Sequence, residues 1–261
     1  MIPIKTKEEI EVMIEGGRRL ARVFDQVLKE VKPGVETKRL DELGEALIKK
    51  EKGKPSFKMV PGYHWSTCIN VNQGVVHGIP GGYRLKEGDL LSLDAGIFYQ
   101  GFHTDKAETI LVQRAKGPAR GGVNSVQSEE KYKFLEAGKR ALEKAIEMAR
   151  PGNYLGQISK VIEKEIGKAG FSPVRALTGH GVGRKLHEEP QIPCFFEREV
   201  EKTAKLKKGM TLAIEIIYNL GLPEVVLTSD GWTIETKDCK IAGLFEETVA
   251  VTAGGPLVLT R

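Results

Sequence analysis

An internal repeat is the feature of this sequence that most narrows its possible folds. A stretch of apolar residues at helical spacing ends at Pro33, and a second such stretch ends at Pro151, 118 positions later. Farther along each copy, a glycine precedes an apolar run that ends in an acid, at Asp94 and at Glu215, which lie 121 positions apart. Features that recur in the same order at nearly one offset indicate a duplicated structural unit.

Each copy is predicted to hold a long helix, a shorter helix and then strands. The first long helix begins at Thr6, because Thr6 and Glu9 form a capping-box pattern ahead of apolar residues at helical spacing. The shorter helix that follows begins at Thr37. The second copy is predicted to form a long helix over residues 128–149 and a shorter one that ends near Gly170.

At 261 residues the chain is long enough to bury a substantial core, and we expect one domain over residues 1–261. Its two halves are expected at about residues 6–112 and 128–252. The segment between them, Gln113–Gln127, is polar, basic and rich in Gly, Pro and Ser, so it is predicted to be a linker. Its three basic residues leave a nucleic-acid role open, although we favour a solvated loop; they are Arg114, Lys116 and Arg120.

The composition argues against several classes of protein. A net charge of +5, from 40 basic and 35 acidic residues, does not by itself predict a nucleic-acid partner. Cys68, Cys194 and Cys239 are odd in number and far apart, so neither a CxxC zinc site nor a disulfide framework is indicated. The first residues show no signal peptide, and no apolar run approaches the ~20 residues needed to cross a bilayer. We therefore expect a soluble, cytoplasmic protein without a membrane partner.

Two acids near a predicted hairpin point to a buried site. Residues 91–98 and 109–112 have the pattern of strands. A two-residue loop at Tyr99-Gln100 would place Asp94 directly opposite Asp105, where paired Cβ atoms are ~5 Å apart and like charges repel. The simpler alternative is two solvent-exposed turn acids. Asp94, however, follows an apolar run, and buried neighbouring acids need a cation, a shared proton or a paired base.

The second copy supplies two matching acids. Glu215 ends the apolar run that the repeat aligns with the run before Asp94, and Glu246 lies within the strand-like run Gly243–Val251. If the two halves face each other, four carboxylates converge between them. Proteins use bridging carboxylate oxygens to hold pairs of divalent metals ~3.5–4 Å apart for hydrolysis. The residues alone therefore indicate a dinuclear metal hydrolase.

The chain has five histidines, and three of them have settings that suit such a site. His180 lies between two glycines, which permits close backbone approach, and His187 opens the sequence His-Glu-Glu-Pro. His77 precedes the first acidic strand. Because a lone histidine is more often a structural or surface group than a ligand, His64 and His103 are taken as non-catalytic.

Seven motifs, taken in order along the chain, resemble those of type I methionine aminopeptidases. They are Asn72–Pro80, Asp94–Gly96, Gly179–Gly183, His187–Pro190, Ile214–Glu215, Asp230–Thr233 and Phe245–Thr248. The resemblance extends from the first helix to Thr252, and as a set the motifs are highly specific. It implies an α+β fold of the duplicated pita-bread type, with a central antiparallel sheet, helices on its outer face and pseudo-two-fold halves.

The resemblance also implies a role for each site residue. The metal ligands would be Asp94, Asp105, His180, Glu215 and Glu246, of which Asp105 and Glu246 bridge two ions. The catalytic residues would be His77, His187 and Glu215. The two non-ligand histidines would contact the substrate and the developing oxyanion, and the methionine pocket would be lined by Tyr63, Cys68 and Trp232.

The implied activity is that of a methionyl aminopeptidase, a metallo-exopeptidase that removes the initiator methionine during protein maturation. Its substrates would be nascent proteins with a small second residue, and a hydroxide shared by two divalent ions would attack the first peptide bond. The ligand set admits Co, Fe, Mn, Zn or Ni. The implied partners are nascent polypeptide N-termini near the ribosome, and the enzyme is expected to be a monomer without a specific nucleic-acid partner.

Three positions depart from the usual pattern of that family. Val76 replaces a cysteine, Leu186 stands where phenylalanine is frequent, and Ile216 stands where proline is usual. The last two would reshape the side-chain pocket and so bear on the preference for methionine, but none of the three removes a ligand. Only 27 residues separate His187 from Glu215, which excludes the inserted helical subdomain of the type II enzymes.

Two alternatives remain open at this stage. A proline-specific peptidase of the same fold, such as an Xaa-Pro aminopeptidase or a prolidase, is expected to carry a large additional N-terminal domain, and the residues before the first helix leave no room for it. A catalytically inactive relative that binds a protein or RNA is expected to have lost some ligands, whereas all five positions here carry competent residues. Metal content and a turnover assay separate the three functions.

Overall fold

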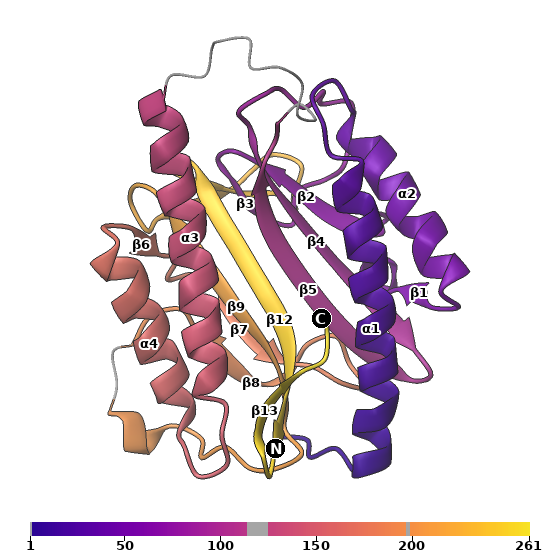
Figure 1. Cartoon of the computed structure of the whole chain (residues 1–261), viewed down its shortest axis with the longest axis vertical. Coiled ribbons are helices and arrows are strands. Elements are labelled where there is room, and N and C mark those ends of the chain that lie inside the picture. Colours follow the sequence, from indigo (N-terminus) through magenta and orange to yellow (C-terminus); the bar gives the residue numbers. More distant parts are fainter. Residues whose placement is uncertain (1, 114–124, 197–198) are drawn as a thin grey trace.

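A computed structural model describes residues 2–113, 125–196 and 199–261 of the protein. Within these residues, four α-helices lie over one face of a large sheet, with α1 and α2 over one half and α3 and α4 over the other (Figure 1). The helices are α1 (Lys7–Lys29), α2 (Thr37–Lys50), α3 (Ser125–Glu147) and α4 (Leu155–Lys168), with short 3₁₀ helices at Phe57–Met59 and Val200–Lys202.

The large sheet has ten strands, and every strand pair in it is antiparallel. Its main path is β1-β4-β5-β12-β9-β7-β8, with β2 paired to β4, β6 to β9 and β13 to β12. These strands are β1 (Lys54–Pro55), β2 (Thr67–Val71), β4 (Leu90–Tyr99), β5 (Phe102–Leu111), β6 (Ser172–Pro173), β7 (Thr178–Gly181), β8 (Glu188–Pro193), β9 (Thr211–Asn219), β12 (Ala242–Thr252) and β13 (Gly255–Val258). A second sheet, in the order β10-β11-β3, consists of β3 (Gly74–Val76), β10 (Val225–Leu227) and β11 (Ile234–Thr236).

The expected fold class is confirmed: the domain is α+β, with a central antiparallel sheet and helices on its outer face, as in the pita-bread fold. The two copies of the repeat have similar elements. Helices α1 and α3 are both 23 residues long, and α2 and α4 are both 14 residues long. Each helix of the second copy begins 118 positions after its counterpart in the first. Division of the chain into halves at about residues 6–112 and 128–252 stays a prediction, which superposition of the two halves will test.

Helix α1 begins where its sequence predicts. The Thr6 hydroxyl accepts a hydrogen bond from the Glu9 backbone N–H at 3.2 Å, and the Glu9 carboxylate accepts one from the Thr6 backbone N–H at 2.9 Å. Together these bonds satisfy two donors that the first turn of a helix otherwise leaves free. The apolar face of α1, which includes Leu20 and Phe24, is buried against β4 and β5.

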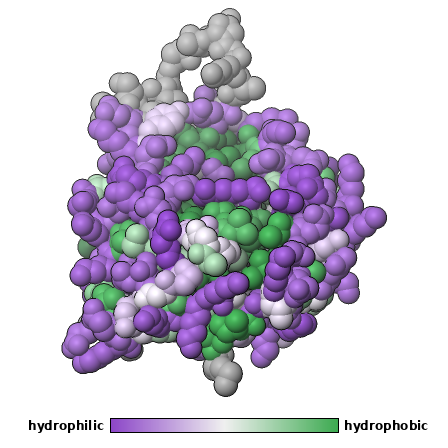
Figure 2. Space-filling view, turned by 60° about the horizontal axis from the view of Figure 1, so that its bottom comes forward, coloured by the Kyte–Doolittle hydropathy of each residue, from purple (hydrophilic) through white to green (hydrophobic). Residues whose placement is uncertain are grey.

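The remaining sequence predictions for the helices are also confirmed within a few residues. Helix α2 begins at Thr37, and α3 begins at Ser125 rather than at the predicted residue 128. Residues 114–124, most of the predicted linker Gln113–Gln127 with all three of its basic residues, lie outside the described residues. Among the described helices, none combines the length and the apolar character that crossing a bilayer requires. In the view of Figure 2 the surface is mostly hydrophilic, and apolar residues form patches between the hydrophilic ones.

Candidate metal centre

Three of the predicted ligands lie in one row across the large sheet. Asp94 on β4 is paired with Ala107 on β5, Ala107 with Glu246 on β12, and Glu246 with Glu215 on β9. Residues that are directly paired on neighbouring strands point to the same face of a sheet. The three carboxylates therefore share one face, and the small Ala107 side chain between Asp94 and Glu246 leaves room above it.

The fourth carboxylate joins this row in a different register from the one that the sequence suggests. The two-residue loop of the β4–β5 hairpin is Gln100-Gly101, not Tyr99-Gln100, so Asp105 is opposite Gly96 and not opposite Asp94. Both loop residues have positive φ, 46° and 91°, as a two-residue hairpin turn of type I′ requires. The predicted pairing is wrong by two residues, and because side chains alternate with a period of two, Asp105 still faces the same side as Asp94.

His180 reaches the carboxylates from β7, at the other side of Glu215. Its Nδ1 lies 2.9 Å from the Gly181 carbonyl oxygen, and when Nδ1 carries the proton of this hydrogen bond, Nε2 is free to bind a metal. A Cβ atom on Gly179 would lie 2.6 Å from the Ala213 carbonyl, so only glycine permits β7 to approach β9 here. One ligand atom each from Asp105, His180 and Glu246 lies within 4.8 Å of the others.

The surroundings of these acids disfavour their charged forms. Burial raises the pKa of Asp105 to about 7, and burial together with repulsion from Asp105 raises the pKa of Glu215 to about 8. Burial and the negative charges of their neighbours hold the pKa values of Asp94 and Glu246 well above the usual carboxyl range. A cation among these groups would relieve the repulsion.

The residues present fit divalent metal ions. Asp94 Oδ1 and Glu246 Oε1 are buried and have no hydrogen-bond partner among the described residues, although buried oxygens are rarely left unpaired. Carboxylate oxygens with a single imidazole suit the ions of manganese, iron, cobalt, nickel and zinc. Burial also lowers the pKa of His180 to about 4, so the imidazole is neutral, as a metal ligand must be, at neutral pH.

The two histidines that are not expected to bind metal lie beside the cluster. The rings of His187 and His180 are 4.5 Å apart between centroids and meet edge to face. Desolvation by the surrounding protein lowers the pKa values of His77 and His187, although both residues are exposed at the surface, so both rings are neutral near pH 7 and can donate one hydrogen bond each. His103 is buried and its Nδ1 lies 2.9 Å from the Ser56 hydroxyl, whereas His64 is exposed.

All ten predicted site residues line one cavity of about 880 Å³. They are Tyr63, Cys68, His77, Asp94, Asp105, His180, His187, Glu215, Trp232 and Glu246. Next to the acids, an apolar cluster contains Phe57, Tyr63, Cys68 and Leu186, with Trp232 packed against it. The Tyr63 and Trp232 rings are 5.1 Å apart, and the Tyr63 hydroxyl donates to the Thr67 carbonyl at 2.9 Å, which fixes the ring in place.

Two of the departures from the family pattern, Leu186 and Ile216, differ in whether they reach the cavity. Leu186 is buried and lines the cavity. Ile216 does not line it, because it follows Glu215 on β9 and its side chain is buried in the core on the opposite face of the sheet. Sequence reasoning missed Phe57, Val60 and Lys5, which also line the cavity. No local pattern distinguishes these residues, since they come from a 3₁₀ helix, a loop and the segment before α1.

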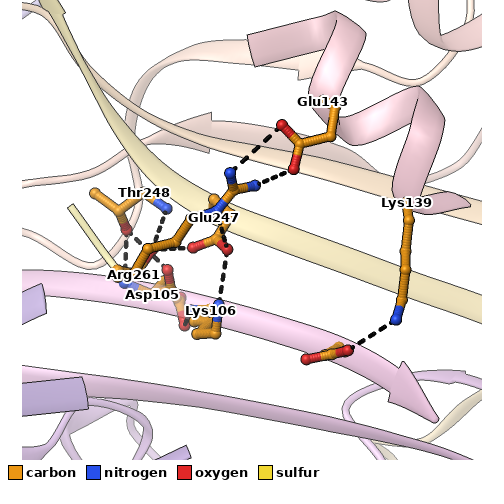
Figure 3. A network of polar contacts seen from close by, with 9 residues as sticks. Asp105, Lys106, Lys139, Glu143, Glu247, Thr248 and Arg261 are labelled. Carbon is orange, nitrogen blue, oxygen red and sulfur yellow. Dashed lines mark hydrogen bonds and ion pairs between the residues drawn. The ribbon is translucent and has the colours of Figure 1, made fainter. Parts of the chain in front are cut away.

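Charged residues support the cluster from the opposite face of the sheet (Figure 3). Lys106 and Glu247 follow Asp105 and Glu246 in the chain, and their side chains form an ion pair of 2.7 Å. Arg261 also reaches Glu247, at 3.0 Å. The Thr248 hydroxyl accepts from the Asp105 backbone N–H and donates to the Asp105 carbonyl, at 2.8 Å each, so it joins β5 to β12 where the predicted ligands lie.

Comparison with known proteins gives consistent matches over the whole chain. The chain is 41% identical over 261 residues to methionine aminopeptidase 1 of Bacillus subtilis (strain 168), and the match covers 100% of both chains. The crystal structure of a methionine aminopeptidase from Thermotoga maritima superposes with a TM-score of 0.92 at 38% identity and covers 100% of both chains. A prolidase from Pyrococcus furiosus has a TM-score of 0.73 at 26% identity, but the match covers 99% of this chain and only 65% of that one. The sequence pattern of metallopeptidase family M24 matches residues 11–253, and this protein is therefore a member of that family.

Proposed function

We propose that this protein is a methionine aminopeptidase, which hydrolyses the peptide bond after an N-terminal methionine when the second residue is small. The observation that carries the proposal is an apolar pocket that adjoins four carboxylates and His180 within one cavity. A peptide whose methionine side chain occupied the pocket would present its first peptide bond to those groups.

The proposed cofactor is a pair of divalent metal ions held by Asp94, Asp105, His180, Glu215 and Glu246. The two unpaired buried oxygens of Asp94 and Glu246 support this assignment. When bound, the two ions would polarise the scissile carbonyl and lower the pKa of an attacking water toward neutrality. Asp105 and Glu246 are proposed to be shared by the two ions, as the family resemblance implies, and one ligand atom of each lies within 4.8 Å of a ligand atom of His180.

The remaining chemistry is assigned to side chains of this chain. Glu215 would accept a proton from the attacking water and deliver it to the leaving amine. His187 would donate a hydrogen bond to the oxyanion that develops on the carbonyl oxygen, which is worth about 2.7–4 kcal/mol in comparable sites. His77 lines the same cavity and would contact the bound peptide.

The pocket itself supports selection of methionine. It is lined by Tyr63, Cys68 and Trp232, together with the apolar residues Phe57 and Leu186. A thioether packs favourably against aromatic rings, and an unbranched side chain fits an irregular pocket better than a branched one. In the cell the proposed substrates are the N-termini of nascent polypeptides at the ribosome, and we propose that the enzyme acts as a cytoplasmic monomer.

Hydrolysis of three peptides tests the proposal, with each candidate metal added to the metal-free enzyme. Met-Ala-Ser should be cleaved to free methionine, and Leu-Ala-Ser and Ala-Pro-Ser should be cleaved far more slowly. Preference for Ala-Pro-Ser would instead indicate a proline-specific peptidase. Binding of two metal equivalents with no cleavage of any peptide would favour the inactive binding protein.

A further inference from the structure

The short segment before α1 buries a lysine beside the candidate site. The Lys5 side chain is only 4% exposed, and it lines the same cavity as the metal cluster. Its backbone N–H donates to the Gly209 carbonyl at 2.7 Å, which fixes the segment against the turn that precedes β9. Lysine is almost never buried to this extent unless its charge is paired.

The partner of Lys5 is Glu188, the residue that follows His187. Lys5 Nζ donates a hydrogen bond to Glu188 Oε2, and the Glu188 side chain is only 6% exposed. The second carboxylate oxygen, Oε1, accepts from the Lys185 backbone N–H at 3.1 Å. The Glu188 side chain therefore closes a hydrogen-bonded turn over residues 185–188, a stretch that includes His187, and Lys5 anchors that turn.

The surrounding backbone leaves space for this contact. A Cβ atom on Gly183 would lie 2.3 Å from Lys5 Cε and 2.6 Å from Lys5 Nζ, so any other residue at position 183 would displace the lysine. A second link between α1 and the same loop, from Glu9 to Arg184 at 2.6 Å, involves an Arg184 side chain that is 67% exposed. Water screens such an exposed pair, and the buried pair is the stronger constraint on the loop.

We propose that Lys5 is a positioning residue for His187, acting through Glu188. The pair holds the loop so that the His187 ring stays 4.5 Å from the His180 ring, at the cavity side where a peptide carbonyl would lie. This inference rests on the proposed function, in which His187 stabilises the oxyanion. His180 itself is fixed by the pairing of β7 with β9 and does not depend on Lys5.

Removal of the tether is expected to impair catalysis without loss of metal. A small displacement of a catalytic group typically costs roughly 10- to 100-fold in rate, so kcat of Lys5→Met should fall by about that factor. Both kcat and kcat/KM should fall, because the affected contact is made in the transition state. Metal affinity measured by calorimetry should be unchanged.

A double-mutant cycle on Met-Ala-Ser hydrolysis tests the mechanism. Lys5→Met is made in the wild-type and in the His187→Ala background. If Lys5 acts through His187, the substitution should cost nothing further once the imidazole is gone. Lys7→Met is the matched control, since Lys7 is exposed, pairs with Glu11 on the surface and should leave kcat unchanged.

Further variants distinguish misplacement of His187 from destabilisation of the whole fold. Lys5→Met leaves the buried Glu188 carboxylate without its cation, which can destabilise the fold. The double variant Lys5→Met/Glu188→Gln contains no unpaired buried charge, keeps an acceptor for the Lys185 N–H and should show the same loss of kcat.

Each of these measurements either supports or overturns the proposed role of Lys5. Equal losses from Lys5→Met in both backgrounds, a drop in metal affinity or an unchanged kcat in the double variant would overturn the inference while the enzyme itself remains an aminopeptidase. A wild-type protein that releases no methionine would refute the proposed function, and with it the role assigned to Lys5.

Discussion

Glu246 on β12 stands directly opposite Glu215 on β9, so two carboxylates face one cavity from neighbouring strands. Directly opposed like charges destabilise an antiparallel strand pair. Asp94 and Asp105 add further negative charge on the same face. The sheet therefore carries a local electrostatic cost that divalent cations would offset, and stability should depend on both pH and metal.

The metal-free protein should lose stability as pH rises toward 8. The folded-state pKa of Glu215 is raised to about 8 from 4.5, so the folded protein holds a proton that the unfolded chain has released. This contribution is present at low pH and is lost as pH rises from 4.5 through about 8. His180 acts in the opposite sense between about 4 and 6.5, because burial lowers its pKa. The window between 6.5 and about 8 isolates the carboxylates.

Thermal melting across that window, with and without Mn²⁺, measures this effect. The melting temperature of the metal-free protein should fall as pH rises, and saturating metal should remove most of the fall because bound ions displace the protons. A melting temperature that stays constant or rises in the metal-free protein would contradict the assigned electrostatics.

His180 and His187 should give opposite results when each is replaced by alanine. His187→Ala should lower kcat by roughly 100- to 1,000-fold and leave metal affinity intact, since it removes the proposed oxyanion donor. His180→Ala should weaken metal binding, because it removes a proposed ligand. Calorimetric titration of both variants distinguishes the roles. Loss of metal from His187→Ala alone would mean that the two assignments are exchanged.

The ion pairs behind the sheet should contribute to stability at the strands that carry the ligands. Glu247→Ala leaves Lys106, which is 13% exposed, without its buried partner, and such a loss typically costs about 3–5 kcal/mol. Urea unfolding of the metal-free protein measures the difference. Lys139→Ala is the control, because its pair with Glu108 is more exposed and should matter by less than about 0.5 kcal/mol. Equal effects of the two substitutions would argue against the buried network.

Two tryptophans next to Tyr63 allow a matched test of the side-chain pocket. Their ring centroids lie 5.1 Å (Trp232) and 5.3 Å (Trp65) from that of Tyr63, but only Trp232 lines the cavity. Trp232→Ala should lower kcat/KM for Met-Ala-Ser by roughly 10- to 100-fold, as expected when a pocket loses about 1–3 kcal/mol of apolar contact. Trp65→Ala should change it far less. Similar losses in both variants would place the methionine side chain elsewhere.

Local sequence signals were sufficient to predict the four helices of the described residues and the long strands that carry the acids, but not most of the short strands. The capping box at Thr6 fixes the start of α1, because the cap and its partner Glu9 are three residues apart and need no other part of the chain. The spacing of their own apolar residues predicted the second pair of helices, and the offset of 118 residues between the copies then indicated the repeat. Glu215 was placed at the end of its apolar run, whereas it lies in the middle of β9, because the strand continues through residues that are buried by distant elements.

For the site residues too, the sequence predicted some features correctly and others wrongly. The spacing of acids on either side of a turn indicated that Asp94 and Asp105 share one face of a sheet, since alternation along a strand is a local property. Their register was predicted wrongly, because a two-residue hairpin turn needs positive φ at both residues, and glycine at position 101 favours Gln100-Gly101 over the predicted Tyr99-Gln100. An error of two residues changes which residues are paired but leaves each side chain on the same face of the sheet, so the predicted acids still lie together.

The sequence by itself determined the helices, the duplicated order of elements and the identity of the acids and histidines that come together. Only the tertiary structure decided which side chains support them. Lys5 and Glu188 are 183 positions apart, and nothing in the residues near either one predicts that they meet. The physical reason is that helix caps and strand alternation arise from neighbouring residues, whereas a buried ion pair exists only after the segment before α1, the turn before β9 and the loop before β8 have packed together.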